Sequence, residues 1–266
     1  MKNFIKNITG NSLKKIFENT VGIEYLIYLN YVFPSTEEKT IKSKRLSFYQ
    51  QFLNQGSIYF DIGANFGNRI EPLIHENFNI VAVEPQAECV KLLKLRYGKK
   101  ITIIPKGLGE KEEIKEMHIA DNSVLSSFST DWIKTTQESG RFKKYNWNNT
   151  RKIEITTLDR VIAEHGKPNF AKIDVEGYEL HVLNGLTQPI EMISLEYAAP
   201  EGINLIEKCL IRLENIATNS IECNYSVGES MEWAGNKWYS LEEMTTVMRT
   251  TEFENTGFGD IYVRSL

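Results

Sequence analysis

The chain has 266 residues, of which 41% are hydrophobic and 25% are charged. This composition is that of a soluble globular protein with one large domain, or one domain and an appendage. Its formal net charge of −4 argues against a general nucleic-acid-binding surface, because such a surface needs clustered Lys and Arg. The three cysteines, at positions 89, 209 and 223, form no CxxC pair. Neither a zinc site nor a disulfide framework is therefore indicated, and a reducing compartment is the default expectation.

Residues 1–56 are predicted to form a mainly helical extension that precedes the domain at 57–266. Ser35, followed three residues later by Glu38, has the spacing of a helix capping box. The N-terminus has no long apolar core and no small-residue cleavage site, so it is a poor signal peptide, and we expect a cytoplasmic protein. The most apolar stretch, at 21–33, is too short for an integral membrane span. We interpret it as an amphipathic helix over an edge of the core, with a membrane-surface contact or a homodimer through the N-terminal helices as open alternatives.

From residue 57 onward, apolar strand-like segments alternate with helical ones. The segments "SIYFDIG", "NIVAVEP" and "ITIIPKGLG" are predicted strands, and the helices between them are expected at 68–76 and 86–97. This βαβαβ order predicts an α/β protein whose parallel sheet has helices on both faces.

The alternation breaks between residues 110 and 158. Two segments there, "EEIKEMHIA" and "RKIEITTL", are predicted strands that pair at a sheet edge, and the polar, aromatic stretch at 121–150 between them is interpreted as a lid or substrate insertion. The alternation then resumes, which gives about seven main strands in all. The later helices are expected at 158–166, 178–186, 202–217 and 240–250, and the later strands at 169–177, 190–197, 220–227 and 260–265.

The turn after the first predicted strand, "FDIGANFGN", is the first chemical signal. Gly63 and Gly67 leave little side-chain bulk there, and glycine permits a tight turn and the close approach of a ligand. The N-terminus of a helix that follows such a turn offers free N–H groups. Seventeen residues after Gly67, the second strand ends in Glu84, and an acid at that place can accept both hydroxyls of a ribose. Together the two features predict a nucleoside site.

The residues around the glycines narrow the choice of nucleoside. The dinucleotide fingerprint G-x-G-x-x-G is absent, and the turn has G-x-x-x-G instead. Asp61 stands two residues before the first glycine, where a carboxylate would serve a pyrophosphate poorly but would suit an ammonium or a sulfonium. The turn therefore favours S-adenosylmethionine as the cofactor, with S-adenosylhomocysteine as its product.

The stretch "AKIDVEGYELHVLNGL" places Lys172, Asp174 and Glu176 at alternate positions, which share one face of a strand. Burying these charges is costly unless something opposite compensates them. Since they end the fourth core strand, which lies beside the first in the usual layout, Asp174 and Glu176 are expected to flank the methionine half of the cofactor.

In chain order, "FDIGANFGN", "VAVEPQ", "KGLGEKE", "TTLD", "KIDVEGYELHVLNGL" and "ISLEY" resemble the FkbM family of class I S-adenosylmethionine-dependent methyltransferases. The resemblance covers roughly residues 57–198 and, more loosely, the closing strand. It implies a Rossmann-like, seven-stranded, mostly parallel sheet whose last strand is antiparallel. It also implies O-methylation of a hydroxyl on a sugar, a glycan or a secondary metabolite. Residues 1–56 and 121–150 fall outside it and would encode the identity of the acceptor.

Each conspicuous residue of the predicted cofactor site has an expected role. Asp61 would orient the amino group of the cofactor, and Glu84 would hold its ribose. The segment that would line the adenine could instead be an ordinary turn after a strand, with no role in binding. The methionine-side loop would be shaped by Gly63, Ala64, Asn65 and Gly67, and the adenine would be lined by Lys106, Gly107 and Leu108.

Methyl transfer to an alcohol needs alignment and a place for the hydroxyl proton. Asp174 is the leading catalytic candidate because it lies at the end of the strand nearest the expected methyl group. Glu196, at the end of the fifth strand, and His181 are further candidates, although His181 also reads as a helix-surface residue. Lys172 reads as a partner in an ion pair. Asp174 and Glu176 could bind Mg²⁺, but no third ligand has convincing spacing, so we expect no metal.

The stretch at 121–150 carries the remaining candidates for contact with a small-molecule or glycan acceptor. Ser126 and Ser127 could approach the cofactor or the acceptor. The aromatic side chains could stack on a sugar face, and they are equally explained as the hydrophobic anchor of a lid. These aromatic residues are Trp132, Phe142, Tyr145 and Trp147.

Two other classes of protein stay open on the sequence alone. An NAD-dependent oxidoreductase or epimerase would share the order of strands and Glu84, but it should show G-x-G-x-x-G and usually a Tyr-x-x-x-Lys pair, and the sequence has neither. A noncatalytic scaffold with the same fold would have little reason to keep Asp61, Glu84 and Asp174 together.

Overall fold

The structure is a computed structural model that describes residues 35–265. The apolar stretch at 21–33 lies outside the described residues. Within 35–265, no helix combines the length and the apolar character needed to cross a bilayer. The helices are α4 Thr36–Tyr49, α5 Ala87–Tyr97, η1 Gly98–Lys100, η2 Ser123–Leu125, α6 Thr130–Glu138, α7 Leu158–His165, α8 Glu179–Asn184, α9 Ile203–Ile216, α10 Leu241–Met248 and α11 Thr251–Glu254. The strands are β1 Ile58–Ile62, β2 Asn79–Val83, β3 Thr102–Ile104, β4 Gly107–Leu108, β5 Glu113–Ile119, β6 Asn149–Thr156, β7 Phe170–Ile173, β8 Met192–Ala198, β9 Ile221–Val227, β10 Tyr239–Ser240 and β11 Phe258–Ser265.

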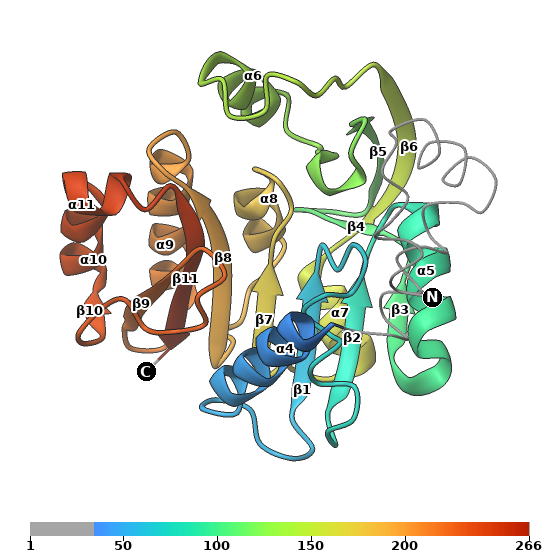
Figure 1. Ribbon diagram of the computed structural model, residues 1–266, viewed down its shortest axis with the longest axis horizontal. Coiled ribbons are helices and arrows are strands. Elements are labelled where there is room, and N and C mark those ends of the chain that lie inside the picture. The colour runs from blue at the N-terminus through green and yellow to red at the C-terminus, as the bar shows by residue number, and fades with distance from the viewer. Residues whose placement is uncertain (1–34, 266) are drawn as a thin grey trace.

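The described residues form one large sheet of eight strands in the order β10-β9-β11-β8-β7-β1-β2-β3 (Figure 1). The strands from β8 to β3 run parallel to one another, and β11 runs antiparallel to both of its neighbours, β8 and β9. The predicted Rossmann-like, mostly parallel sheet with an antiparallel last strand is confirmed. The count is eight rather than seven because the two-residue strand β10 pairs with the outer edge of β9.

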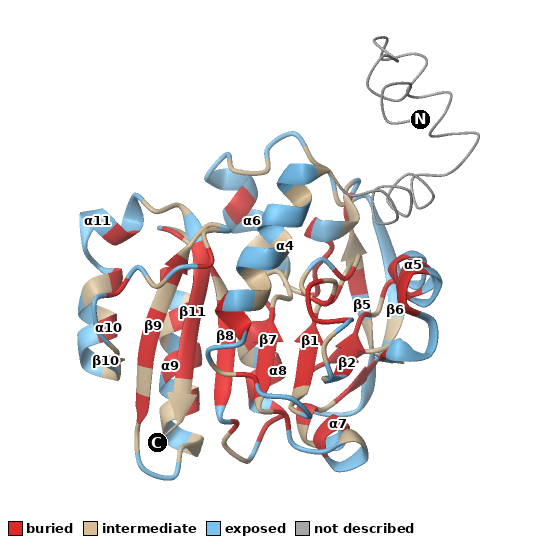
Figure 2. Cartoon of the chain, turned by 60° about the horizontal axis from the view of Figure 1, so that its bottom comes forward, coloured by how far each residue is buried: buried red, intermediate tan, exposed pale blue. Residues whose placement is uncertain are grey.

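Apolar side chains on the two faces of the sheet pack against different layers of helices. On one face, strand residues such as Ile62 and Ile173 join the buried side chains of α7, α8, α9 and α10. On the other, residues such as Tyr59 and Phe170 join those of α4, α5 and the segment after β1. Figure 2 shows the central strands buried between these layers. Successive side chains of one strand therefore pack into different layers, as expected for strands that are covered on both faces.

Helix α4 is the described part of the predicted N-terminal extension. Ser35 and Glu38 form the expected reciprocal capping box at its start. At its other end Phe48 and Tyr49 are buried, and the Phe48 ring contacts Tyr262 of β11 with a distance of 5.3 Å between ring centroids. The helix thus packs across the sheet. Its residue Arg45 lines the cavity described below.

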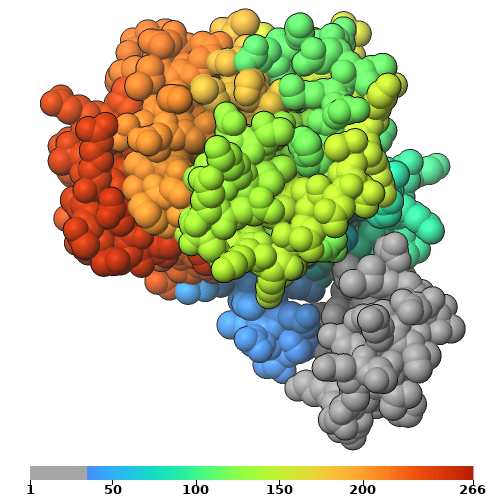
Figure 3. All heavy atoms as spheres, turned by 90° about the horizontal axis from the view of Figure 1, so that it is seen from above, coloured from blue at the N-terminus to red at the C-terminus, as the bar shows by residue number. Residues whose placement is uncertain are grey.

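The two strands predicted between residues 110 and 158 pair with each other, as β5 and β6, in a separate sheet of order β4-β6-β5. The segment 121–150 connects them and carries α6. Seen from above the carboxyl ends of the parallel strands, this yellow-green segment spans the face between the orange-to-red part of the chain and the teal part (Figure 3). The chain therefore covers the end of the sheet at which ligands of open α/β sheets bind.

Two sequence-based predictions fail at prolines. The helix predicted at 68–76 is a run of turns, although Ile70, Leu73 and Ile74 are buried as its apolar spacing suggested. Pro72 lies in its middle, and a proline inside a helix removes one hydrogen bond and clashes with the preceding turn. The single strand predicted at 101–109 is split at Pro105 into β3 and β4, which belong to different sheets.

Candidate functional site

A cavity of about 320 Å³, called here the first cavity, opens at the carboxyl ends of β1, β2 and β7. Most of the residues predicted for the cofactor site line it. Gly67 and His181 do not, and Gly67 instead contributes to the shape of the loop that does. The predicted residues that line the first cavity are Asp61, Gly63, Ala64, Asn65, Glu84, Lys106, Gly107, Leu108, Asp174 and Glu196.

The glycine loop after β1 has a shape that only glycine tolerates at two positions. Gly63 has φ +84°, and a Cβ there would lie 1.8 Å from the carbonyl oxygen of Asp174. Gly67 has φ +77°, and a Cβ there would meet the Tyr97 ring of α5 at 2.6 Å. Tyr97 also donates its hydroxyl to the Gly67 carbonyl at 2.7 Å. The glycines therefore bring the loop against the end of β7 on one side and against α5 on the other.

Glu84 follows β2 and is almost fully buried, with 2% of its surface exposed. One carboxyl oxygen accepts the backbone N–H of Asn65 at 2.8 Å, and the other accepts the backbone N–H of Gln86 at 2.7 Å. Burial raises the pKa of this carboxyl to about 7, although both N–H bonds favour its ionised form. Each oxygen keeps a second lone pair and Glu84 lines the cavity, so Glu84 can both hold the glycine loop and accept hydroxyl groups of a ligand.

Asp61, in β1, is buried and has an oxygen with no partner. Its Oδ2 atom makes no hydrogen bond within the described residues, and a buried polar atom left unpaired costs free energy. Burial raises the pKa of Asp61 to about 6, and the nearby charge of Lys172 counteracts part of this rise. An ammonium group in the first cavity is the kind of ligand that would satisfy this oxygen.

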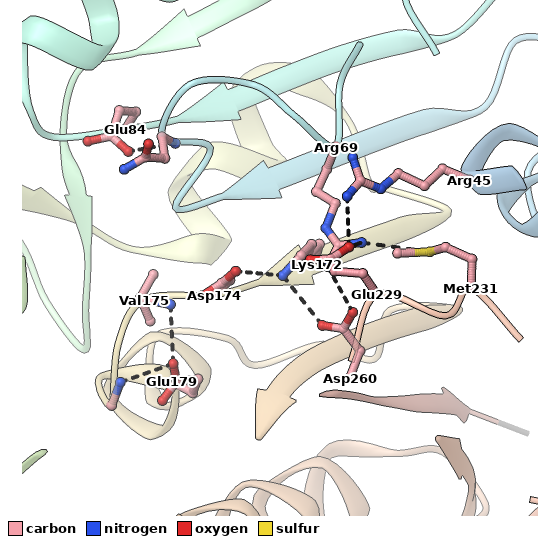
Figure 4. A network of polar contacts seen from close by, with 12 residues as sticks. Arg45, Arg69, Glu84, Lys172, Asp174, Val175, Glu179, Glu229, Met231 and Asp260 are labelled. Carbon is pink, nitrogen blue, oxygen red and sulfur yellow. Dashed lines mark hydrogen bonds and ion pairs between the residues drawn. The ribbon is translucent and has the colours of Figure 1, made fainter. Parts of the chain in front are cut away.

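Lys172, in β7, is the centre of a buried ion-pair network (Figure 4). Its Nζ lies 2.8 Å from Oδ2 of Asp174 and 3.4 Å from Oδ1 of Asp260. Burial alone would lower the pKa of Lys172, but these two carboxylates outweigh it and raise the pKa. The prediction that Lys172, Asp174 and Glu176 share one strand face is wrong for the last two, because β7 ends at Ile173 and Glu176 has a positive φ of 53°. The charge of Lys172 is compensated from inside the protein, by Asp260 of β11 and by Asp174 after β7.

The network continues to the N-terminal helix through two arginines. Arg69 lies 3.2 Å from Asp260 and 3.0 Å from Glu229. Glu229 also accepts Nη2 of Arg45 at 2.7 Å. Arg45, Arg69 and Glu229 all line the first cavity, and the Nε atom of Arg45 is buried with no hydrogen-bond partner in the described chain. This part of the cavity therefore carries two guanidinium groups, one of them from α4, beside the carboxylates that pair with them.

Three carboxyl groups that line the cavity lie close together. Oxygen atoms of Asp174, Glu176 and Glu196 lie within 4.8 Å of one another. Burial raises the pKa of Asp174, but the charge and hydrogen bond of Lys172 outweigh it and lower the pKa. Burial raises the pKa of Glu196 well above its usual range, and the neighbouring charge of Asp174 raises it further. The pKa values of these two neighbouring carboxyl groups are thus shifted in opposite directions.

The structure supplies the third carboxyl group that the sequence spacing did not reveal as a metal ligand. Three carboxyl oxygens can hold a divalent cation. However, Lys172 already balances Asp174, and Glu176, like Glu196, has a pKa raised by burial and then by its acidic neighbours. The expectation of no metal stays a prediction.

His181, the third catalytic candidate, lies on the outer side of α8. Its ring nitrogen Nδ1 is 2.9 Å from the Glu110 carboxylate, and its side chain is 47% exposed. The ring stacks on Tyr178 at 4.2 Å between centroids. The structure therefore does not bring His181 together with Asp174 and Glu196, and it has the surface position that was its alternative interpretation.

The serines and aromatic residues of the 121–150 segment divide into two groups. Ser126 lines the first cavity, while Ser127 donates its hydroxyl to the Glu176 carbonyl at 2.6 Å. Trp132 and Phe142 line a neighbouring cavity, which Tyr145 and Trp147 do not. The Trp147 ring nitrogen instead donates to the carbonyl of Leu125, so this tryptophan anchors the segment itself.

Sequence reasoning missed Arg45, Arg69, Glu229 and Asp260. Asp260 reaches the site because β11 is inserted between β8 and β9, which sets Asp260 opposite Glu196. That register depends on the order of strands rather than on any local pattern. Arg69 had a faint signal, since it follows the glycine turn by two residues.

This sheet, with its glycine loop after the first strand and an acid after the second, is Rossmann-like. The family model of the methyltransferase FkbM domain matches residues 61–253. The chain therefore belongs to the FkbM methyltransferase family. A search of curated protein sequences gives no match.

Several solved methyltransferase structures are similar to this chain at low sequence identity. A precorrin-6y C5,15-methyltransferase from Geobacter metallireducens has 11% identity and a TM-score of 0.41, over 84% of this chain and 86% of that one. A TehB-like SAM-dependent methyltransferase from Corynebacterium glutamicum has 8% identity and a TM-score of 0.44, over 84% and 88%. A SAM-dependent O-methyltransferase from Thermotoga maritima has 11% identity and a TM-score of 0.41, over 85% and 65%. At such TM-scores these likenesses carry no argument about the substrate.

Proposed function

We propose that the protein transfers a methyl group from S-adenosylmethionine to a hydroxyl group on a sugar, a glycan or a secondary metabolite. The observation that carries the proposal is the set of unlike groups around the first cavity of an FkbM-family domain. A buried acid suited to a ribose, Glu84, stands at one place, and a buried carboxylate with one unpartnered oxygen, Asp61, stands at another. A dinucleotide needs an acid such as Glu84 for its ribose, but it has no ammonium group that Asp61 could bind.

The residues of the first cavity fit the cofactor part by part. Glu84 would accept the ribose hydroxyls, and Asp61 would accept the ammonium of the methionine half. Arg45 carries an unpaired Nε atom at the cavity and would bind the methionine carboxylate, a pairing that suits a guanidinium. The adenine would lie against Lys106, Gly107 and Leu108, which line the same cavity.

When bound, S-adenosylmethionine supplies an electrophilic methyl group on a positively charged sulfur. The hydroxyl oxygen of the acceptor forms the new C–O bond as the C–S bond breaks, and its proton must leave to a base or to water. Asp174 is the residue that we assign to receive or steer this proton. Its lowered pKa keeps it ionised at neutral pH, so it can accept a hydrogen bond from the hydroxyl. Glu196 is the second candidate.

An NAD-dependent oxidoreductase or epimerase is the alternative that shares the fold. The carboxylate of Asp61 would oppose a pyrophosphate at the glycine loop, because Asp61 lies two residues before Gly63 and lines the same cavity. The family match also favours methyl transfer.

Asp174→Asn tests the proposed chemistry, because it keeps the shape of the side chain and removes its charge. With a methyl-labelled cofactor and a panel of sugars, glycans and hydroxylated metabolites, turnover should fall by about 10²–10⁴-fold if Asp174 is the general base. Affinity for S-adenosylmethionine should change much less. If Asp174 chiefly balances the sulfonium, affinity for S-adenosylmethionine should fall while that for the uncharged thioether product should not. Near-normal turnover would remove Asp174 from the mechanism and move the assignment to Glu196.

A further inference from the structure

A second cavity, of about 370 Å³, lies between the 121–150 segment and the layer formed by β8, α9 and the start of β11. It meets the first cavity at Val124, Glu176 and Glu196, which line both. Asp174 lies within the same carboxyl cluster. A molecule in the second cavity can therefore present a group at the junction, where the proposed chemistry takes place.

The walls of the second cavity are largely apolar and aromatic. On the side of the 121–150 segment, the rings of Trp132 and Phe142 lie 5.9 Å apart at an angle of 42°. The opposite wall carries aliphatic side chains of α9 and the rings of Tyr197 and Phe258. The Tyr197 hydroxyl is already bonded to Thr256, so this residue offers mainly its ring. Such walls suit the apolar face of a flat or ring-shaped ligand.

The 121–150 segment is attached to the junction by close contacts. Glu176 and Gly177 both have positive φ, of 53° and 85°, so the chain turns sharply after β7. A Cβ on Gly177 would lie 2.3 Å from the Trp132 side chain, and Ser127 donates to the Glu176 carbonyl. The aromatic wall is thus held in a fixed place beside the carboxyl groups of the junction.

The second cavity offers no spare positive charge for an anionic ligand. Arg141 is the one lysine or arginine among the described residues that line it, and its guanidinium is held by both oxygens of Glu201 and by the carbonyls of Ala199 and Gly257. The other charged residues of the lining are acidic. Of these, Glu179 accepts the backbone N–H groups of Val175 and Gly177, which leaves Glu176 and Glu196 to face a ligand.

We propose that the second cavity binds the methyl acceptor, and that the acceptor is an uncharged polyhydroxyl ring such as the sugar of a neutral glycoside. This inference rests on the proposed function. One face of the ring lies on Trp132 and Phe142, and one hydroxyl reaches the junction at Glu176 and Glu196. A phosphate or carboxylate on the bound ring would find no free cation among the described residues of this cavity to replace its lost hydration, because the guanidinium of Arg141 is already paired with Glu201. A sugar nucleotide would have to keep its diphosphate outside.

Titration of the protein saturated with S-adenosylhomocysteine tests this class of acceptor. The probes are methyl hexopyranosides and the corresponding hexose 1-phosphates, and the readout is tryptophan fluorescence together with heat. Uncharged glycosides should bind, and the phosphates should bind at least about tenfold more weakly, as expected for an uncompensated charge. Equal or tighter binding of a phosphate would overturn the proposal, as would the absence of binding by every uncharged glycoside.

Variants of the aromatic wall separate this inference from the proposed function. Trp132→Ala and Phe142→Ala should each weaken glycoside binding by about tenfold, the effect expected for loss of an aromatic contact in a binding site. Tyr145→Ala is the control, because Tyr145 belongs to the same segment but does not line the second cavity. Affinity for S-adenosylhomocysteine should change in none of them. Glycoside binding that survives in both wall variants would contradict the inference, whereas wild-type protein that binds no S-adenosylhomocysteine would contradict the proposed function.

Discussion

The Nζ atom of Lys172 lies 2.8 Å from Oδ2 of Asp174, and the lysine side chain is 2% exposed. A buried charge of this kind is tolerated only when it is paired. Lys172 therefore has two consequences. It keeps Asp174 ionised beside the junction of the two cavities, and it joins the ends of β7 and β11 through its second partner, Asp260.

Replacing Lys172 by methionine should destabilise the protein strongly. The change leaves Asp174 and Asp260 without their shared cation, and breaking a buried ion pair by removing one partner costs about 3–5 kcal/mol. Chemical denaturation measures this loss. Lys134→Met is the control, since its side chain is 75% exposed and its Glu138 partner is 3.9 Å away. A loss of stability no larger than that of the control would show that the network is not a structural requirement.

Glu84→Ala should weaken the binding of S-adenosylmethionine by about 1.5–3 kcal/mol, the range for hydrogen bonds to a charged group. Because Glu84 also accepts the N–H groups of Asn65 and Gln86, some loss of stability should accompany the change. Glu88→Ala, which removes a half-exposed acid that pairs with Arg151 on the surface, should leave affinity unchanged. Calorimetric titration decides the matter. Unchanged affinity in Glu84→Ala would place the nucleoside elsewhere.

Affinity for S-adenosylhomocysteine should rise with pH between about 5.5 and 8, because ribose hydroxyls donate to an ionised Glu84 and its pKa is about 7. Below pH 7 the loss should approach about tenfold per pH unit for one required ionisation. Titrations of wild type and Glu84→Gln at several pH values test this, since the variant should lose most of the dependence.

The same raised pKa has the opposite effect on the ligand-free protein. Glu84 binds its proton more tightly in the folded state, with a pKa of about 7, than its usual value of 4.5. Its contribution to stability is therefore fully present below pH 4.5 and is lost as the pH rises toward 7. For the binding measurement, an affinity for S-adenosylhomocysteine that falls with rising pH would contradict the role assigned to the ionised Glu84 carboxylate.

Arg45→Ala should weaken the binding of S-adenosylhomocysteine by about 1.5–3 kcal/mol, because the amino-acid carboxylate loses a charged hydrogen-bond donor. Affinity for 5′-methylthioadenosine, which lacks the amino-acid half, should not change. Lys44→Ala is the matched control on α4, since Lys44 pairs with Glu232 on the surface. If both ligands lost affinity equally in Arg45→Ala, the arginine would act on the shape of the cavity rather than on the carboxylate.

The glycine loop and Glu84 could be predicted from the sequence because consecutive parallel strands end at the same edge of a sheet. Asp174 and Glu196 could be placed for the same reason, since β7 and β8 are parallel neighbours. Asp260 and Arg45 could not. Asp260 comes to the site through the antiparallel register of β11 against β8, and Arg45 through the packing of α4 across the sheet. Pairings that distant in the chain leave no local pattern in one sequence.

Prolines explain two errors in the predicted secondary structure, the helix at 68–76 and the single strand at 101–109. Both prolines are visible in the sequence. Ile70, Leu73 and Ile74 have the spacing of one helical face and are buried, so they belong to the core although the segment is not a helix. Pro72 removes the hydrogen bonding that a regular helix needs. The core thus tolerates turns where the pattern predicted a helix.

Calorimetric titration of the unmodified protein with S-adenosylmethionine, S-adenosylhomocysteine and NAD tests the proposed function most directly. Both methionine-derived ligands should bind at one site per chain, and NAD should not bind, because Asp61 suits an ammonium and opposes a pyrophosphate at the glycine loop. Binding of NAD without binding of S-adenosylmethionine would contradict the proposal and assign the first cavity to a dinucleotide.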